Sequence, residues 1–270
     1  MNLRFLPNLI TLLNLFIGCI VVLLLIENNI EVKYVFVLSM ICLVLDYLDG
    51  FIARKLNAKS ELGLQLDSLA DMISFGLVPG ILLYNMFLDA PSSSVGSISS
   101  SFIPFMGFFI TLCSAYRLAK FNTLKTNSKY FRGLPTPANT ILIFALSIIS
   151  KGDSYIAEII LNYNVIIFII LISGFLLVSN LKLITFKFNN FKFKGNRSRF
   201  LLMFISVPVL LMLGVYSVPV ILGLYIIISI FTFLLNPSLL CCVLDQHMIS
   251  RKTFKLVSPI LWINKSLCYL

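Results

Sequence analysis

Four aspartates, Asp46, Asp49, Asp67 and Asp71, are the side chains in this sequence best suited to carry out chemistry. They lie in an otherwise largely apolar chain. A carboxylate at membrane depth costs about 2.5–3.5 kcal/mol on insertion scales, so acids in such places usually mark a functional site. Carboxylate oxygens suit Mg²⁺, Mn²⁺ or Ca²⁺, and a pair of such ions can act on a phosphoryl group. We therefore expect a metal-dependent site for phosphoryl chemistry.

The residues between the two aspartate pairs fit that chemistry. Gly50 lets a bulky group approach the backbone, and Ala53 leaves room on the same helical face. Arg54 supplies a forked cation suited to a phosphate. Gly63 would permit the chain to turn into the next helix. The pattern predicts a diphosphate, bridged by metals, beside Arg54.

The elements that must position these residues are membrane-spanning helices. Of the 270 residues, 59% are hydrophobic and 12% are charged, whereas soluble domains average about 25% charged residues. The composition predicts an all-α, polytopic integral membrane helical bundle. Apolar runs of about 20 residues indicate about eight transmembrane helices. These lie near 7–26, 33–53, 67–88, 102–118, 137–150, 156–180, 200–215 and 217–236.

The spacing of the aspartates places them at facing helix ends. Asp46 and Asp49 are three positions apart at the end of the second span, and Asp67 and Asp71 are four apart at the start of the third. Neighbours on a helix face lie three or four positions apart. The short connection makes the two helices antiparallel and adjacent, so all four carboxylates can converge. Without cations, four such acids would repel one another or take up protons.

Basic residues distinguish the two sides of the membrane. They follow the second, fourth and sixth spans, as in Arg54–Lys59, Lys120–Arg132 and Lys182–Arg199. The positive-inside rule then places both termini and the aspartates on the cytoplasmic side of the cell (plasma or inner) membrane. The net charge of +10 accompanies no nucleic-acid recognition motif. We expect the anionic membrane surface as its partner, and no nucleic acid.

A cation transporter is the alternative from another functional class. Isolated intramembrane acids often belong to ion pathways or proton relays. Such a pathway needs neither the glycines nor Arg54, and the sequence has no internal repeat of the kind common in transporters. We therefore favour one transmembrane catalytic domain over residues 1–236, followed by a tail, 237–270, to which we assign no role.

The aspartate segment resembles a known family. Asp46-x2-Asp49-Gly50-x2-Ala53-Arg54-x8-Gly63-x3-Asp67-x3-Asp71 matches in every position the signature of the CDP-alcohol phosphatidyltransferases. The resemblance implies a membrane enzyme with that family's fold. It would transfer a phosphatidyl group from a CDP-linked lipid to an alcohol and release CMP. It also implies two divalent cations, Mg²⁺ or Mn²⁺, on the four aspartates, with Asp71 as general base, and the homodimer common in the family.

The same resemblance implies which residues contact the CDP-lipid. They are Asn8, Leu9, Ile10, Thr11, Gly50, Ala53, Arg54 and Ser60.

Three further segments indicate the acceptor alcohol. Residues 7–14, 74–79 and 117–138 resemble the phosphatidylserine synthases within that family, and this resemblance covers roughly residues 5–235. It implies CDP-diacylglycerol and L-serine as substrates. The carboxylate of serine needs a cation, for which Arg117 and Arg132 are the candidates. Glycerol 3-phosphate is the alternative acceptor; as a dianion, it would want more cations around the pocket.

Overall fold

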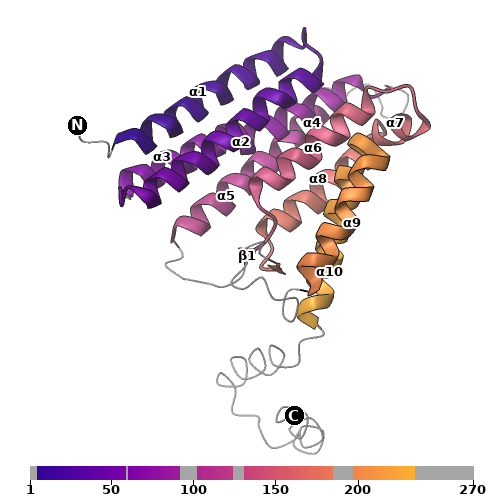
Figure 1. Cartoon of the computed structure of the whole chain (residues 1–270). Helices are drawn as coiled ribbons and strands as arrows, with labels where there is room; N and C mark the ends of the chain where they lie inside the picture. The colour runs from indigo at the N-terminus through magenta and orange to yellow at the C-terminus, as the bar shows by residue number, and fades with distance from the viewer. Residues whose placement is uncertain (1–4, 59, 92–101, 124–130, 185–196, 235–270) are drawn as a thin grey trace, which may run out of the picture.

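The chain forms a bundle of helices (Figure 1). The computed structural model describes residues 5–58, 60–91, 102–123, 131–184 and 197–234. Its elements are α1 (Leu6–Glu27), α2 (Val32–Lys55), α3 (Glu61–Asp71), the π-helix η2 (Met72–Leu77), α4 (Val78–Asp89), the 3₁₀ helix η4 (Ile103–Phe108), α5 (Phe109–Thr123), β1 (Phe131–Arg132), α6 (Thr136–Ser150), α7 (Tyr155–Ile160), α8 (Tyr163–Val178), β2 (Lys182–Leu183), α9 (Arg197–Leu213), the 3₁₀ turn η5 (Gly214–Tyr216) and α10 (Ser217–Leu234). The predicted tail, 237–270, lies outside the described residues.

The prediction of a polytopic helical membrane protein is confirmed. Four helical runs are long and apolar enough to cross a membrane: Leu6–Glu27, Val32–Lys55, Glu61–Asp89 and Arg199–Thr232. Thr136–Ser150 and Tyr163–Val178 are shorter apolar helices. Large apolar side chains, among them Phe16, Phe168 and Phe175, are exposed on the outside of the bundle. Such a surface suits lipid rather than water. The number of crossings, eight, stays a prediction.

The last long run is a helical hairpin. Gly214 adopts a positive φ of 52° between α9 and α10, and these two helices pack against each other. Glycine tolerates this left-handed conformation because it lacks a Cβ atom. Figure 1 shows α9 and α10 side by side at one edge of the bundle. The two last predicted spans therefore form a pair of helices.

Helix α4 lies at the centre of the core. Nearly all of its apolar residues are buried, and Val78, Leu82, Leu83 and Met86 are completely so. It packs against α6, α5, α8 and η4. Because the core gathers around the helix that continues α3 and η2, the run carrying Asp67 and Asp71 is anchored deep in the bundle.

The third helix starts earlier than the sequence predicted. It begins at Glu61, capped by Ser60, whose Oγ accepts a hydrogen bond of 3.0 Å from the Gly63 amide. The expected role of Gly63 as a turn residue is therefore wrong, since it lies inside the first turn of α3. Among the described residues of this connection, Asn57 adopts the left-handed conformation, with φ 49°.

A short pairing of strands fixes the entry to α6. Strands β1 and β2 pair antiparallel, with Phe131 opposite Leu183. The following Gly133 has φ 72°, and a Cβ there would lie 2.8 Å from the Ser179 carbonyl oxygen. Only glycine fits this conformation and this close approach to the end of α8. Helix α6 then starts at Thr136 with a proline in its first turn.

Candidate active site

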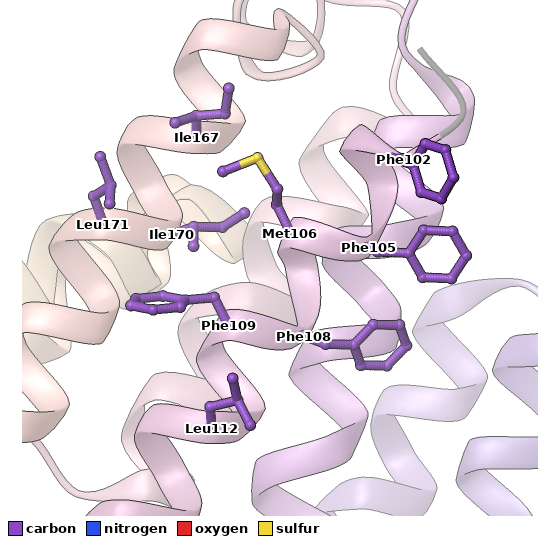
Figure 2. A pocket seen from close by; sticks show the side chains of 9 residues that line it. All are labelled: Phe102, Phe105, Met106, Phe108, Phe109, Leu112, Ile167, Ile170 and Leu171. Carbon is purple, nitrogen blue, oxygen red and sulfur yellow. The ribbon is translucent and has the colours of Figure 1, made fainter. Parts of the chain in front are cut away.

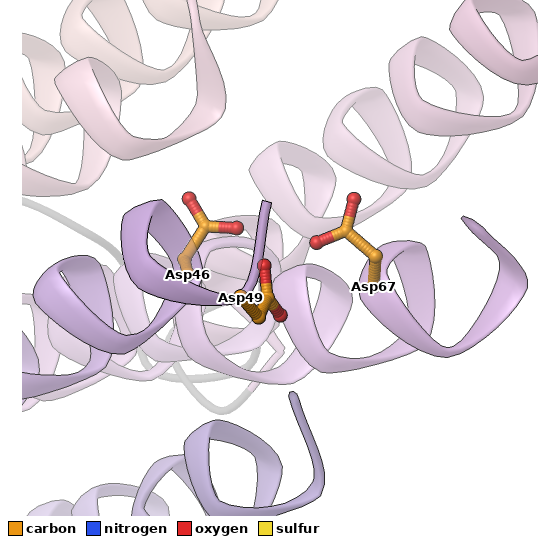
Figure 3. Close-up of side chains that lie close together, drawn as sticks. All are labelled: Asp46, Asp49 and Asp67. Carbon is orange, nitrogen blue, oxygen red and sulfur yellow. The ribbon is translucent and has the colours of Figure 1, made fainter. Parts of the chain in front are cut away.

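Three of the four aspartates meet between α2 and α3, two helices that both pack against α1. The cluster takes one carboxylate oxygen from each of Asp46, Asp49 and Asp67. These three oxygens lie within 4.8 Å of one another. Figure 3 shows Asp46 and Asp49 on one helix and Asp67 facing them from the other. Their convergence agrees with the sequence spacing. The arrangement can bind a cation that takes oxygen ligands.

Asp71 adjoins this cluster. Its carboxyl group lies beside that of Asp46, and its Oδ1 is buried without a hydrogen-bond partner among the described residues. A buried carboxylate oxygen is rarely left unpaired in a native structure. This oxygen is therefore available for a ligand or for a proton.

Helix α1 holds the most buried aspartate in place. The Thr11 hydroxyl donates a hydrogen bond to Oδ2 of Asp49, and only 4% of either residue is exposed. The same hydroxyl lies 3.0 Å from the Pro7 carbonyl oxygen. The sequence placed Thr11 at the nucleotide; the structure brings it to a candidate metal ligand.

Arg54 folds back along α2 over Gly50. Its Nη1 lies 3.4 Å from the position that a Cβ on residue 50 would occupy. Because residue 50 has no side chain, the Arg54 guanidinium can lie against the helix there, within one turn of Asp49. A forked cation beside a group of acids suits a phosphate that enters with metal ions. Ala53 is half-buried on the same helix.

Of the remaining predicted nucleotide residues, Asn8 and Ser60 lie at the start of α3. Oδ1 of Asn8 lies 3.0 Å from the position of a Cβ on Gly63, so this glycine permits close packing of α1 on α3. Ser60 is exposed and caps α3. Ile10 is half-buried, and Leu9 is 53% exposed. Whether these residues contact a nucleotide stays a prediction.

Of the two predicted acceptor arginines, the structure places Arg117 at the site. Its Nη1 donates to Oγ1 of Thr136 at 3.4 Å, and its Nε is buried without a partner among the described residues. Its guanidinium also interacts electrostatically with Asp71. The side chain of Arg132 lies outside the described part of the chain, although its backbone belongs to β1.

The comparison with known families agrees with this geometry. The model of the CDP-alcohol phosphatidyltransferase family matches residues 4–175, well over half of the chain. The chain belongs to this family. The match includes the four aspartates, Arg54 and Arg117, and it ends inside α8.

Several curated proteins are similar to this CDP-alcohol phosphatidyltransferase. A CDP-diacylglycerol–serine O-phosphatidyltransferase of Helicobacter pylori is 31% identical over 84% of this chain and 90% of its own length. One of the same name from Methanocaldococcus jannaschii is 32% identical over 64% of this chain and 70% of its own. An archaetidylserine synthase of Methanothermobacter thermautotrophicus is 34% identical over 51% of this chain and 55% of its own.

The donor set of this CDP-alcohol phosphatidyltransferase fits divalent metal ions. All of its candidate ligand atoms are carboxylate oxygens, three of them close enough together to share an ion. Carboxylate oxygens are the ligands of Mg²⁺, Mn²⁺ and Ca²⁺ rather than of softer metals. The unpaired Oδ1 of Asp71 adds a further oxygen at the edge of the cluster. The acidic cluster can therefore hold divalent metal.

Sequence reasoning missed a group of polar residues on α6. Thr136, Asn139 and Thr140 are almost fully buried in an otherwise apolar helix. Both polar ends of the Asn139 amide lack a partner among the described residues. Their signal was present in the sequence as polar side chains at positions i, i+3 and i+4 of an apolar span. Such spacing gathers them on one helix face.

An apolar groove lies between η4, the first turn of α5 and α8. A space of about 450 Å³ is lined by Phe102, Phe105, Met106, Phe108, Phe109, Leu112, Ile167, Ile170 and Leu171 (Figure 2). None of these side chains carries a charged group or an oxygen atom, so none suits Mg²⁺, Mn²⁺ or a phosphate. The residues suited to metal-dependent chemistry are those of the cluster between α2 and α3.

Proposed function

We propose that the chain transfers the phosphatidyl group of CDP-diacylglycerol to L-serine, giving phosphatidylserine and CMP. The observation that carries the proposal is the convergence of Asp46, Asp49 and Asp67 next to Asp71 and Arg117. The names of the relatives support serine as the acceptor, since two of those described are serine phosphatidyltransferases and a third is an archaetidylserine synthase. None of them favours glycerol 3-phosphate.

In this mechanism Asp71 acts as general base. The serine hydroxyl has an unperturbed pKa far too high for attack without help, so a base must accept its proton. The buried and unpaired Oδ1 of Asp71 is suited to that task. The serine oxygen forms a bond to the phosphorus of the phosphatidyl group. The bond from that phosphorus to the CMP oxygen breaks, and CMP leaves with the electron pair.

The four aspartates would hold two divalent cations, Mg²⁺ or Mn²⁺. When bound, these ions neutralise the diphosphate and stabilise the charge that develops on departing CMP. EDTA should abolish CMP release, and added Mn²⁺ or Mg²⁺ should restore it. Activity that persists after complete chelation would contradict a metal-dependent reaction.

The remaining residues bind the two substrates. Arg54, above Gly50, would contact the diphosphate, and the start of α1 (Asn8–Thr11), with Ala53 and Ser60, would contact the CDP moiety. Arg117, and with it Arg132, would bind the serine carboxylate as forked cations. Holding the lipid and the soluble acceptor together supplies the orientation that the reaction requires.

We place this site on the cytoplasmic side of the cell membrane. Arg54 and Lys55 in the last turn of α2, next to the cluster, support that orientation. CDP-linked lipid and serine would both be accessible there. Residues 1–236 would form the catalytic domain, and a homodimer is the expected assembly from the family resemblance.

A panel of acceptors tests the proposal. Purified protein in lipid is incubated with labelled CDP-diacylglycerol and Mn²⁺, and CMP release is measured with serine, glycerol 3-phosphate, inositol, inositol phosphate or choline. Release with serine alone is expected. Release with glycerol 3-phosphate alone would make the chain a phosphatidylglycerophosphate synthase, and cation flux without CMP release would make it a transporter.

A further inference from the structure

The helix that carries Asp67 and Asp71 changes its geometry directly after Asp71. Residues Met72–Leu77 form the π-helix η2, which ends with the Val78 amide bonded to the Ile73 carbonyl, five residues back. Single π turns inside α-helices occur frequently at functional sites. The sequence supplies a local cause, because Pro79 has no amide hydrogen and cannot donate to the Phe75 carbonyl four residues earlier.

Three other helices bind to this π turn through polar side chains. From α1, Asn14 accepts a hydrogen bond of 3.1 Å from the Ser74 hydroxyl. From α5, the Thr111 hydroxyl donates to the Gly76 carbonyl at 3.0 Å. From α6, the Thr140 hydroxyl donates to the Phe75 carbonyl at 2.8 Å.

The bond from Thr140 goes to the carbonyl that an amide at position 79 would reach in an α-helix. A backbone carbonyl without a partner is costly inside a membrane, where no water can replace the missing donor. Thr140 is 1% exposed, and the other acceptor near its hydroxyl among the described residues is the Thr136 carbonyl of its own helix, at 3.0 Å. Its hydroxyl therefore joins α6 to the Phe75 peptide, one turn beyond Asp71.

The same face of α6 also reaches the candidate acceptor arginine. Thr136 lies one turn before Thr140, and its Oγ1 accepts a hydrogen bond from Arg117. Two threonines four positions apart on α6 thus contact both parts of the proposed site. Thr136 contacts Arg117, the proposed cation for serine. Thr140 contacts the π turn that follows Asp71, the proposed base.

We infer that Thr140 is a positioning residue that sets Asp71 relative to the acceptor by fixing the π turn, while Thr136 orients Arg117. This inference depends on the proposed function of the site. It predicts that the two threonines affect different kinetic constants. Thr140 acts on proton removal and so on kcat, whereas Thr136 acts on acceptor binding and so on the KM for serine. A purely structural role would change stability and both kinetic constants without such a division.

The test compares four single variants in steady-state kinetics with serine. Thr140→Val removes the hydroxyl at nearly constant shape, and kcat should fall about tenfold, as expected when one buried hydrogen bond that positions the helix one turn beyond Asp71 is lost. The KM for serine and the binding of Mn²⁺ should stay within twofold. Thr140→Ser keeps the hydroxyl and should restore kcat. Thr136→Val should raise the KM for serine with little change in kcat.

Ser150→Ala is the matched control. Its hydroxyl is also buried on α6, but its hydrogen bond within the described part of the chain goes to the Ser147 carbonyl of the same helix. Its kinetic constants should equal those of the unsubstituted protein.

A further variant covers the case in which Thr140→Val does not fold. Pro79→Ala restores the missing amide, so the double variant P79A/T140V has a donor for the Phe75 carbonyl but no link to α6. It should fold and still show the reduced kcat. An unchanged kcat in a folded Thr140→Val or P79A/T140V protein would overturn the inference. Failure of the unsubstituted protein to release CMP with serine would instead refute the proposed function.

Discussion

Replacing Thr11 by valine tests whether helix α1 positions a metal ligand. The substitution keeps the shape of the side chain and removes the hydroxyl that donates to Oδ2 of Asp49. Both residues are 4% exposed, so water cannot easily take the place of the lost donor. Hydrogen bonds to charged groups contribute about 1.5–3 kcal/mol. If that energy orients Asp49 for a cation, Mn²⁺ affinity should fall by about tenfold to about a hundredfold.

The assay titrates Mn²⁺ into the purified protein without nucleotide and measures free Mn²⁺ by electron paramagnetic resonance. Thr11→Ser should bind nearly as tightly as the unsubstituted protein, because it retains the donor. Thr123→Val is the matched control, since the hydrogen bond that the structure shows for the Thr123 hydroxyl goes to the Lys120 carbonyl of its own helix. An unchanged Mn²⁺ affinity in a folded Thr11→Val protein would refute the reasoning. A lower affinity for CDP-lipid alone would return Thr11 to the predicted role of nucleotide contact.

Three further predictions concern the base, the acceptor and the fold. Asp71→Asn should lower the rate of CMP release by at least about a hundredfold, within the range of general base catalysis. It should leave CDP-lipid binding largely intact. Turnover near that of the unsubstituted protein would exclude Asp71 as the base. Arg117→Ala and Arg132→Ala should each raise the KM for serine about tenfold or more, because hydrogen bonds to charged groups contribute about 1.5–3 kcal/mol. An unchanged KM in both variants would exclude the two arginines as serine ligands. Gly133→Ala should lower the free energy of unfolding by at least about 2 kcal/mol, because the φ of Gly133 is 72° and a Cβ there would meet the Ser179 carbonyl. The loss should appear as thermal inactivation at a lower temperature. Gly223→Ala is its control, as a Cβ there meets nothing within 4 Å; equal losses at both positions would contradict the steric argument.

Spacing alone was enough to predict the meeting of the aspartates. Positions three and four apart share a helix face, and a short connection makes consecutive helices neighbours. The convergence of Asp46, Asp49 and Asp67 follows from those two rules. The apolar runs predicted the helices from their length, since about 20 consecutive apolar residues can cross lipid as a helix that satisfies its own backbone hydrogen bonds.

The contacts between distant segments could not be predicted in the same way. The bond from Thr11 to Asp49 depends on how α1 rotates against α2, which no local pattern determines. Gly63 appeared to be a turn residue because glycine often serves there. The structure uses it for close packing against Asn8, a requirement imposed by a helix more than fifty positions away. The start of α3 was misplaced because the first turn, Glu61–Leu64, is less apolar than the span that follows.

The π turn shows how a local rule and a distant contact combine. Pro79 indicates that the Phe75 carbonyl loses its helical donor, and this could be inferred from the sequence. The replacement by Thr140 could not, because it comes from a helix 65 positions away. In lipid such a carbonyl must find a donor within the protein. The position of the helix around Asp71 is therefore determined jointly by a proline that removes a hydrogen bond and by a threonine that supplies one. The aspartates can perform the proposed chemistry only if such neutral residues keep them in register.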